Sequence, residues 1–250
     1  MSRIADYLSS LRRKRSGFDT PPAPERDFVA IGDVHGCDGL LAQLLDRVEH
    51  EAPGLPVIFV GDYVDRGPDS AGVLARIMEL TRSGAVGLRG NHEAMMLDFV
   101  DMPARAGPQW LTNGGVQTLE SFGVPAPADP WDDNALTDAR DALIDRAGPA
   151  LIAWLRERPL IWQSGNVAVT HAGGDPSSPL EPRRGHGLLW GHPDFWRKRR
   201  KDGLWMVHGH YIVAAPGMRD GRISIDTGAF HTHRLTAAIV TRGDVRFVST

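Results

Sequence analysis

Five short polar segments of the chain contain residue types that bind metal ions, and each follows an apolar run typical of a β-strand. In chain order they are GDVHG (residues 32–36), GDYVDRG (61–67), RGNHE (89–93), HAGG (171–174) and HGHY (208–211). A single Gly-Asp pair or histidine after a strand is usually a turn or a structural residue. Five such segments in one chain are hard to explain by turns, and together they predict a metal site.

The donors in these segments are carboxylates, imidazoles and an amide, without a cysteine cluster. Such a set suits Mn²⁺, Fe or Zn²⁺ better than a structural thiolate zinc site. There are too many donors for one ion with an open position, whereas two ions that share a bridging carboxylate would use them all. Two ions about 3.5–4 Å apart can clamp the attacking and leaving oxygens of a displacement.

The elements that must position these segments alternate between strand and helix in the first half of the chain. Apolar runs at 28–32, 57–61 and 85–88 predict strands, and helical spacing predicts helices at 38–50, 70–81 and 93–100. This alternation predicts an α/β fold with parallel strands, whose ligands bind beyond the carboxyl ends of the strands. The middle is more helical (109–124 and 135–159), and residues 160–250 return to strands in mixed or antiparallel pairing.

Length and composition limit the number of domains, the partners and the cellular location that can be expected. The 250 residues fit one domain, and 42% hydrophobic residues suffice for a core. A net charge of −3 gives no reason to expect a nucleic-acid partner. The single cysteine, Cys37, excludes an internal disulfide. Without an apolar run of about 18 residues or a signal-peptide core, we expect a cytoplasmic protein that does not enter a membrane. The oligomeric state is not predicted.

Residues 1–26 differ from the rest, because RRKRSG is basic and TPPAPER is proline-rich. They predict a flexible tail, or alternatively a docking or anion-binding arm, before a catalytic domain at 27–250.

The ordered set GDVHG, GDYVDRG, RGNHE, HAG and GH resembles the signature of the phosphoprotein phosphatase family of calcineurin-like metallophosphoesterases. WLTNGGVQTLESFG and IDTGAF resemble its small bacterial members. The resemblance runs from about Asp27 to the C-terminus. It implies a four-layer α/β/β/α sandwich with a dimetal site, Mn being the expected metal and Fe or Zn the alternatives.

The resemblance also implies a ligand set. Asp33 and His35 would bind the first metal, Asp62 would bridge both, and the second would be bound by Asn91, His171 and His210. His210 is preferred to His208 because the family's ligand follows a glycine. His208, Arg89 and Glu93 would have supporting or structural roles.

The catalytic residues implied are His92, Asp65 and Arg66. Asp65 would orient His92, which protonates the leaving oxygen, while Arg66 and Asn91 bind the phosphate. A metal-bridging hydroxide would attack phosphorus in line, without a phosphoenzyme.

The chain departs from the family where a second phosphate-binding arginine is usual. In LLWGHPDFW, His192 stands at that position, and a histidine is a weaker, pH-dependent clamp. RKRRK (197–201) is interpreted as a solvated face or as a patch that steers acidic substrates. Tyr211 would shape the rim of the site or pack on a strand, and Cys37 would pack at a helix start, a redox role being the lesser alternative.

Three functions remain open. The first is a metal-dependent phosphomonoesterase, of the protein serine/threonine phosphatase type, that acts on a phosphorylated protein or a small phosphate ester. The second is a dinucleoside polyphosphate hydrolase with the same metal core. The third is a non-catalytic phosphate-binding scaffold, against which the complete set of ligands and the His92–Asp65 pair argue.

Overall fold

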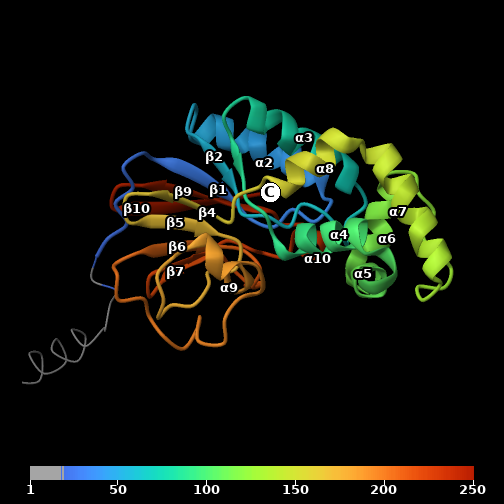
Figure 1. Cartoon of the computed structure of the whole chain (residues 1–250). Coiled ribbons are helices and arrows are strands. Elements are labelled where there is room, and N and C mark those ends of the chain that lie inside the picture. The colour runs from blue at the N-terminus through green and yellow to red at the C-terminus, as the bar shows by residue number, and fades with distance from the viewer. Residues whose placement is uncertain (1–17, 19) are drawn as a thin grey trace, which may run out of the picture.

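The computed structural model describes Phe18 and residues 20–250, which form two five-stranded sheets packed face to face with helices around them (Figure 1). The first sheet has the order β10-β9-β1-β2-β3. Its strands are β1 (Phe28–Ile31), β2 (Val57–Phe59), β3 (Val86–Gly87), β9 (Thr236–Thr241) and β10 (Asp244–Ser249). The strands β1, β2 and β3 are parallel, as the alternation of strands and helices predicts, and β9 is antiparallel to β1.

The second sheet has the order β4-β5-β6-β8-β7 and mixed pairing, as predicted. Its strands are β4 (Ile161–Ser164), β5 (Val167–Thr170), β6 (Trp205–His208), β7 (Gly217–Arg219) and β8 (Arg222–Ser224). The parallel neighbours β5, β6 and β8 send their carboxyl ends to one edge. The chain after β5 and β6 therefore reaches the same region as the chain after β1, β2 and β3.

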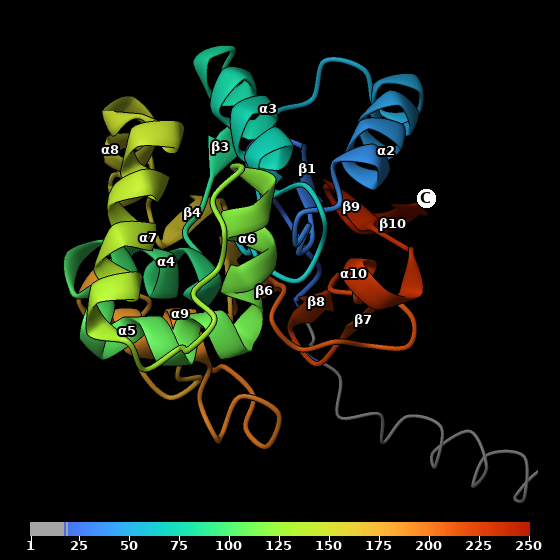
Figure 2. The same ribbon diagram turned by 90° about the vertical axis from the view of Figure 1, so that its right-hand side faces the viewer.

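The core lies in two layers because side chains alternate along each strand. Phe28 and Ala30 of β1 face Val167 and Val207 of the other sheet, within the cluster between the sheets. Val29 and Ile31 face the helices instead. Helices α2 (Asp38–Glu51) and α3 (Ser70–Arg82) cover this outer face (Figure 2).

The helices between β3 and β4 form a group beside the sheets, which Figure 2 shows on the side of these two strands. They are α4 (Asn91–Asp101), α5 (Pro103–Trp110), the π-helical turn η1 (Leu111–Gly115), α6 (Val116–Ser121), α7 (Asp133–Ala147) and α8 (Pro149–Arg156). Among the described residues, no helix is both long and apolar enough to cross a bilayer.

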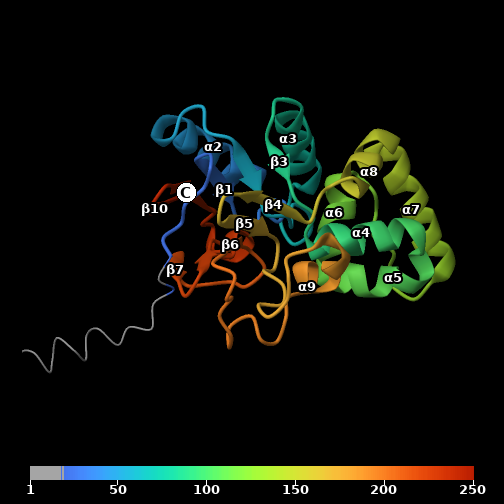
Figure 3. The same ribbon diagram turned by 60° about the vertical axis from the view of Figure 1, so that its left-hand side comes forward.

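The far side of the second sheet is covered mainly by irregular chain, residues 171–204, which we call the outer loop. It contains only the 3₁₀ turn η2 (Pro182–Arg184) and the short helix α9 (Gly185–Trp190), and Figure 3 shows it in gold and orange beside β6. Arg222 of β8 fastens it to the sheet by donating to the carbonyls of Phe195 and Lys198. The two-sheet sandwich is thus confirmed, with one outer layer made largely of loop. A last short helix, α10 (Ala229–Thr232), follows β8.

The chain already contacts the sheets before residue 27. The amide of Ala23 donates to Asn166 Oδ1 at 2.6 Å, and that of Arg26 donates to Ser164 Oγ at 3.0 Å. Phe18 lies edge-on to Trp205. The described part of the predicted tail is therefore held to the domain, and the rest of that prediction falls on residues 1–17 and 19, which lie outside the described residues.

Candidate metal and phosphate site

The GDYVDRG segment is a tight loop after β2, shaped by the buried carboxylate of Glu93. Glu93 Oε2 accepts hydrogen bonds from the amides of Asp62 and Gly90, each at 2.8 Å. Glu93 Oε1 accepts from the amides of Tyr63 at 2.7 Å and Val64 at 3.3 Å. Burial, and then the charge of Asp62, raise the pKa of Glu93 to about 7. The structural role expected for Glu93 is therefore that of a clamp on the loop that carries Asp62 and Asp65.

The backbone of the site is strained in several places. Of the seven described non-glycine residues with positive φ, five are candidate site residues, with φ between 45° and 72°: His35, Asp62, Asp65, Arg66 and His210. Such conformations each cost about 1–3 kcal/mol and persist only when the surroundings enforce them. The surrounding structure therefore holds these residues in strained conformations that orient their side chains.

Asp62 lies between two groups of donors. His35, Asp62 and His92 form one group, and Asp62, His171 and His210 form the other, with the donor atoms of each group within 4.8 Å of one another. Asp62 Oδ2 is 3.6 Å from His35 Nε2, while Asp62 Oδ1 is 3.4 Å from His171 Nε2. The two carboxylate oxygens therefore face different imidazoles, which is the arrangement a bridging ligand requires.

In the second group, His171 and His210 both lie close to the side-chain oxygen of Asn91, at the start of α4. Asn91 Oδ1 lies 2.8 Å from His171 Nε2 and 3.0 Å from His210 Nδ1. Ligands about 2.1 Å from one ion lie roughly 3 Å apart, so these spacings suit a shared ion. In the first group, His35 Nδ1 donates to the carbonyl of Val64 at 2.9 Å, which leaves Nε2 with its lone pair.

Asp33 belongs to neither of the two donor groups, so its role as a metal ligand stays a prediction, but its carboxylate contacts the site. Its Oδ2 accepts from the amide of His210 at 2.9 Å, and its Oδ1 is buried without a hydrogen-bond partner among the described residues. A side chain at Gly209 would meet Oδ1, since an added Cβ would lie 1.8 Å away. Residue 209 must therefore be glycine for the backbone to pass close enough to Asp33 for the His210 amide to donate to it.

The buried carboxyls of the site crowd one another. Burial raises the pKa of the Asp33 carboxyl well above its usual range, and the charges of Asp226 and Asp62 raise it further. Burial also raises the pKa of Asp226, with Asp62 contributing. Asp226, in IDTGAF, was not singled out from the sequence. Buried acids so close together are stable as anions when cations lie among them, so these residues fit a site for divalent metal ions.

His92 and Asp65 form a buried pair beside the first group. His92 Nδ1 donates to Asp65 Oδ2 at 2.7 Å. Burial lowers the pKa of His92, but the charge of Asp62 and the bond to Asp65 outweigh it, so the pKa is raised overall. Asp65 is itself held by two residues that the sequence did not single out. Trp110 Nε1 donates to both carboxylate oxygens at 3.0 and 3.1 Å, and Thr118 Oγ1 donates to Oδ1 at 2.7 Å.

Arg66 places its guanidinium against the first group. One amino group lies 3.2 Å from His35 Nε2 and the other 3.1 Å from His92 Nε2. The guanidinium carbon lies 4.8 Å from the ring centre of Phe230 in α10. The Arg66 amide donates to the carbonyl of Gly114 in η1 at 3.3 Å. Arg66 is thus half-buried, within reach of both imidazoles and of any phosphate bound there.

Two further histidines considered from the sequence, His208 and His192, lie outside both donor groups. Both ring nitrogens of His208 are engaged, Nδ1 with the carbonyl of Gly209 and Nε2 with Ser224 Oγ, each at 2.9 Å. His192 Nδ1 accepts from the amide of Asp194 at 3.2 Å and lies 3.9 Å from Asp175. His192 does not belong to either donor group, so its predicted contact with phosphate stays a prediction.

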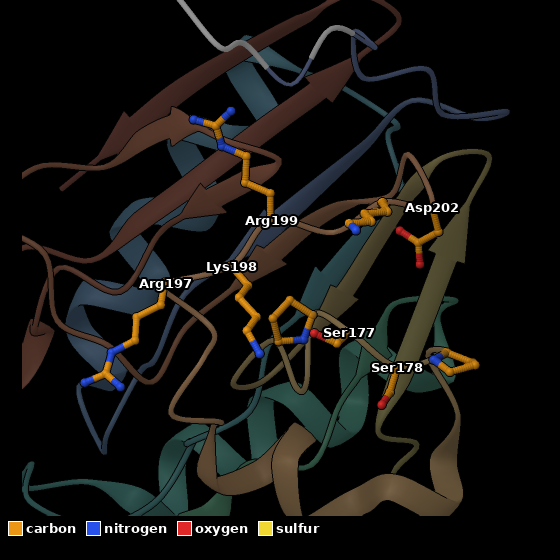
Figure 4. A pocket seen from close by; sticks show the side chains of 9 residues that line it. Ser177, Ser178, Arg197, Lys198, Arg199 and Asp202 are labelled. Carbon is orange, nitrogen blue, oxygen red and sulfur yellow. The ribbon is translucent and has the colours of Figure 1, made fainter.

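Four cations of the basic run 197–201, all except the buried Arg200, line a cavity of about 980 Å³ in the outer loop, together with Ser177 and Ser178 (Figure 4). Figure 4 shows Arg197 and Arg199 extending to different sides of it. Three of the five cations form ion pairs: Lys198 with Asp194, Arg199 with Asp220, and Arg200 with Asp202. Much of the charge is therefore neutralised locally, which favours the interpretation as a solvated face. Steering of acidic substrates stays a prediction.

Cys37 and Tyr211 lie close to the site, and neither belongs to a donor group. Burial raises the pKa of the Cys37 thiol to about 11, so it stays protonated near pH 7, which disfavours a redox role. The Tyr211 ring stacks on Phe195, with centroids 5.4 Å apart, and lies edge-on to His210 at 4.9 Å. Tyr211 thus joins the outer loop to the second donor group.

Comparison with known proteins agrees with this geometry. The family model of calcineurin-like phosphoesterases (Metallophos) matches residues 27–221. Serine/threonine-protein phosphatase 1 of Salmonella typhimurium is 43% identical over 93 residues, which is 36% of this chain and only 39% of that phosphatase. The asymmetrical bis(5'-nucleosyl)-tetraphosphatase PrpE of Bacillus velezensis is 26% identical over 234 residues, 84% of this chain and 87% of that protein. A crystal structure provisionally assigned as a diadenosine tetraphosphatase shares the fold, with a TM-score of 0.59 and 23% identity over 91% of this chain and 95% of its own.

Proposed function

The chain belongs to the calcineurin-like phosphoesterase family and is a hydrolase of that kind, and from this premise we propose that it cleaves dinucleoside polyphosphates with two bound divalent metal ions. One observation carries the proposal: two groups of metal donors share Asp62, and the His92–Asp65 pair and Arg66 lie directly beside them. A site of this form places a phosphate between cations and a proton donor.

The choice of a dinucleotide substrate over a phosphoprotein rests on how far each relative extends. The tetraphosphatase relative aligns along most of both chains, whereas the protein phosphatase aligns over about a third of this chain. A short alignment of higher identity is expected where only a metal core is shared. Protein dephosphorylation, our first expectation from the sequence, becomes the second candidate, favoured by the 43% identity within that segment.

The ligands we propose are those that the motifs imply. Asp33, His35 and Asp62 would hold one ion, and Asp62, Asn91, His171 and His210 the other. When bound, the ions would polarise a phosphoryl oxygen and lower the pKa of bound water toward about 7. The spacing of the second group and the two-sided position of Asp62 support this set.

The remaining steps belong to the side chains around the ions. Arg66 would bind phosphate oxygens through its two amino groups and offset the charge that develops during cleavage. His92 would give the proton on Nε2 to the leaving phosphate oxygen, while Asp65 keeps Nδ1 protonated and the ring in place. The hydrogen bond that His92 Nδ1 donates to Asp65 supports this role, because a neighbouring carboxylate stabilises the protonated imidazole.

A substrate panel tests the proposal. Protein supplied with Mn²⁺ is given diadenosine tetraphosphate, a serine phosphopeptide and p-nitrophenyl phosphate, and kcat/KM is measured for each. We expect the dinucleotide to be preferred by at least tenfold. Two molecules of ADP would indicate symmetrical cleavage, and ATP with AMP asymmetrical cleavage. Preference for the phosphopeptide would establish the second candidate, and absence of turnover on all three would revive the scaffold hypothesis.

A further inference from the structure

A cavity of about 580 Å³ opens next to Arg66, on the side of the site formed by η1, α6 and α10. Leu111, Val116 and Phe230 contribute its apolar surface. The remaining lining is largely polar and includes Thr112, Asn113 and Gln117. A volume of several hundred Å³ is in the range of small-molecule sites. Because Arg66 also lines the cavity, a ligand bound there would be continuous with the phosphate site.

The wall of the cavity at Gly114 packs directly against the backbone of Arg66. Gly114 has φ 109°, and a Cβ there would lie 2.6 Å from the Arg66 amide nitrogen. The Arg66 amide also donates to the Gly114 carbonyl. The wall of the cavity and the proposed phosphate-binding residue are thus one packed unit.

The polar groups of the cavity differ in what they can still bind. The Thr112 hydroxyl donates to the Pro108 carbonyl, and the Asn113 amide donates to the Gln109 carbonyl, each at 2.8 Å. The side chain of Gln117 is exposed and makes no hydrogen bond within the part of the chain that the structure describes. Its side chain therefore offers a donor and an acceptor side by side.

A carboxamide of this kind matches one edge of adenine, because it can accept from N6 and donate to N7 at the same time. An aromatic ring provides the face on which a base stacks. In this cavity the ring is Phe230, which already lies against the Arg66 guanidinium and edge-on to His35.

We propose that this cavity is a nucleobase subsite, in which Gln117 reads the N6 and N7 edge of adenine while the base lies on Phe230. The inference rests on the proposed function, since it assigns the base next to the cleaved phosphates. It makes Gln117 a specificity-determining residue that does not take part in the chemistry.

The turnover experiment compares Gln117→Leu with wild type on diadenosine tetraphosphate, diuridine tetraphosphate and p-nitrophenyl phosphate. Gln43→Leu, an exposed glutamine of α2, is the matched control. We expect wild type to prefer the adenine dinucleotide by about tenfold. Gln117→Leu should raise KM for that substrate about tenfold, leave kcat within twofold, remove the base preference and leave p-nitrophenyl phosphate unaffected. Equal base preference in wild type, or unchanged KM in the variant, would overturn the subsite while leaving dinucleotide hydrolysis standing.

A binding experiment separates the subsite from the proposed function. AMP and ribose 5-phosphate are titrated calorimetrically into the Mn²⁺-loaded protein, because the two ligands differ only in the base. We expect AMP to bind about tenfold more tightly to wild type and to Gln43→Leu, and equally with ribose 5-phosphate to Gln117→Leu. If that pattern appears without hydrolysis of any dinucleotide, the proposed function fails and the subsite stands. Equal binding of both ligands to wild type would contradict the subsite.

Discussion

The two sides of the site are built differently. On one side, which we call the inner wall, residues 61–67, 91–93 and 110–118 hold one another through buried hydrogen bonds: Asp65 is fully buried and contacts His92, Trp110 and Thr118. On the other side, the outer loop carries His192, whose side chain is 32% exposed, and a basic run in which three of the five cations pair with carboxylates.

This difference indicates that the two sides have different roles in catalysis and in substrate binding. Buried, multiply bonded side chains keep one geometry, which proton transfer and phosphate binding require. Exposed ion pairs contribute little to stability and adjust easily, which suits contacts with the variable part of a substrate. Changes in the inner wall should therefore affect turnover strongly, and changes in the outer loop weakly.

The largest effect is expected from Asp65→Asn, because it removes the charge that orients His92 and favours its protonated form. We expect kcat on diadenosine tetraphosphate to fall by roughly 10²–10⁴-fold, the range for general acid–base catalysis. Metal content, measured by mass spectrometry, should stay at the wild-type level. Turnover within threefold of wild type would remove the His92–Asp65 pair from the mechanism.

Glu93→Gln should act on stability first. Glu93 accepts from four backbone amides, and a carboxamide turns a donor toward some of them. We expect the free energy of unfolding to fall by about 2–3 kcal/mol, measured by urea denaturation. Glu79→Gln, on the exposed face of α3, is the control and should change it by less than about 0.5 kcal/mol. A stability equal to wild type would show that the loop is held by other contacts.

Trp110→Phe tests one bond within the inner wall. The substitution keeps a ring to stack on Phe99, now 4.6 Å away between centroids, but removes the N–H that donates to Asp65. We expect a loss of about 1–2 kcal/mol in unfolding free energy and a fall in kcat of about tenfold. Trp196→Phe, in the half-exposed outer loop, should leave both unchanged. Equal effects of the two substitutions would contradict the conclusion that the inner wall affects turnover more strongly than the outer loop does.

His192→Ala should have the smallest effect. Its contacts are to Asp194 and Asp175 within the outer loop, so we expect kcat/KM to stay within threefold of wild type between pH 6 and 8. A fall of more than tenfold, restored by His192→Arg, would instead place this residue at the phosphate, where the family usually has arginine.

The sequence predicted what periodicity and strand-end motifs encode. The strands and helices from β1 to α4 have regular apolar spacing, and the motifs after the strands contain every residue of the two donor groups. Helix α5 was missed because Pro103, Gly107 and Pro108 interrupt its pattern. Strand β7 (Gly-Met-Arg) was missed because it is largely exposed and contains no apolar run.

The supporting residues of the site were harder to predict for a different reason. Trp110 and Thr118 contact Asp65 across 45 and 53 residues of chain, a separation for which no spacing rule exists. Asp226 is an ordinary turn residue until the fold places it beside Asp33 and Asp62. The grouping of His92 with His35 and Asp62 also depends on the fold. The motifs exclude His92 from the metal ligands, while its distance from Asp62 would allow it.

The metal content of His92→Asn therefore tests the central claim, that Asp62 joins two metal ions while His92 remains free to transfer a proton. Wild type, His92→Asn and Asp62→Asn are loaded with Mn²⁺, desalted and analysed by mass spectrometry, alongside kcat on diadenosine tetraphosphate. We predict two ions per chain for wild type and for His92→Asn, with kcat of the latter at least a hundredfold lower, and loss of metal from Asp62→Asn. Loss of an ion from His92→Asn would contradict the claim and make His92 a metal ligand.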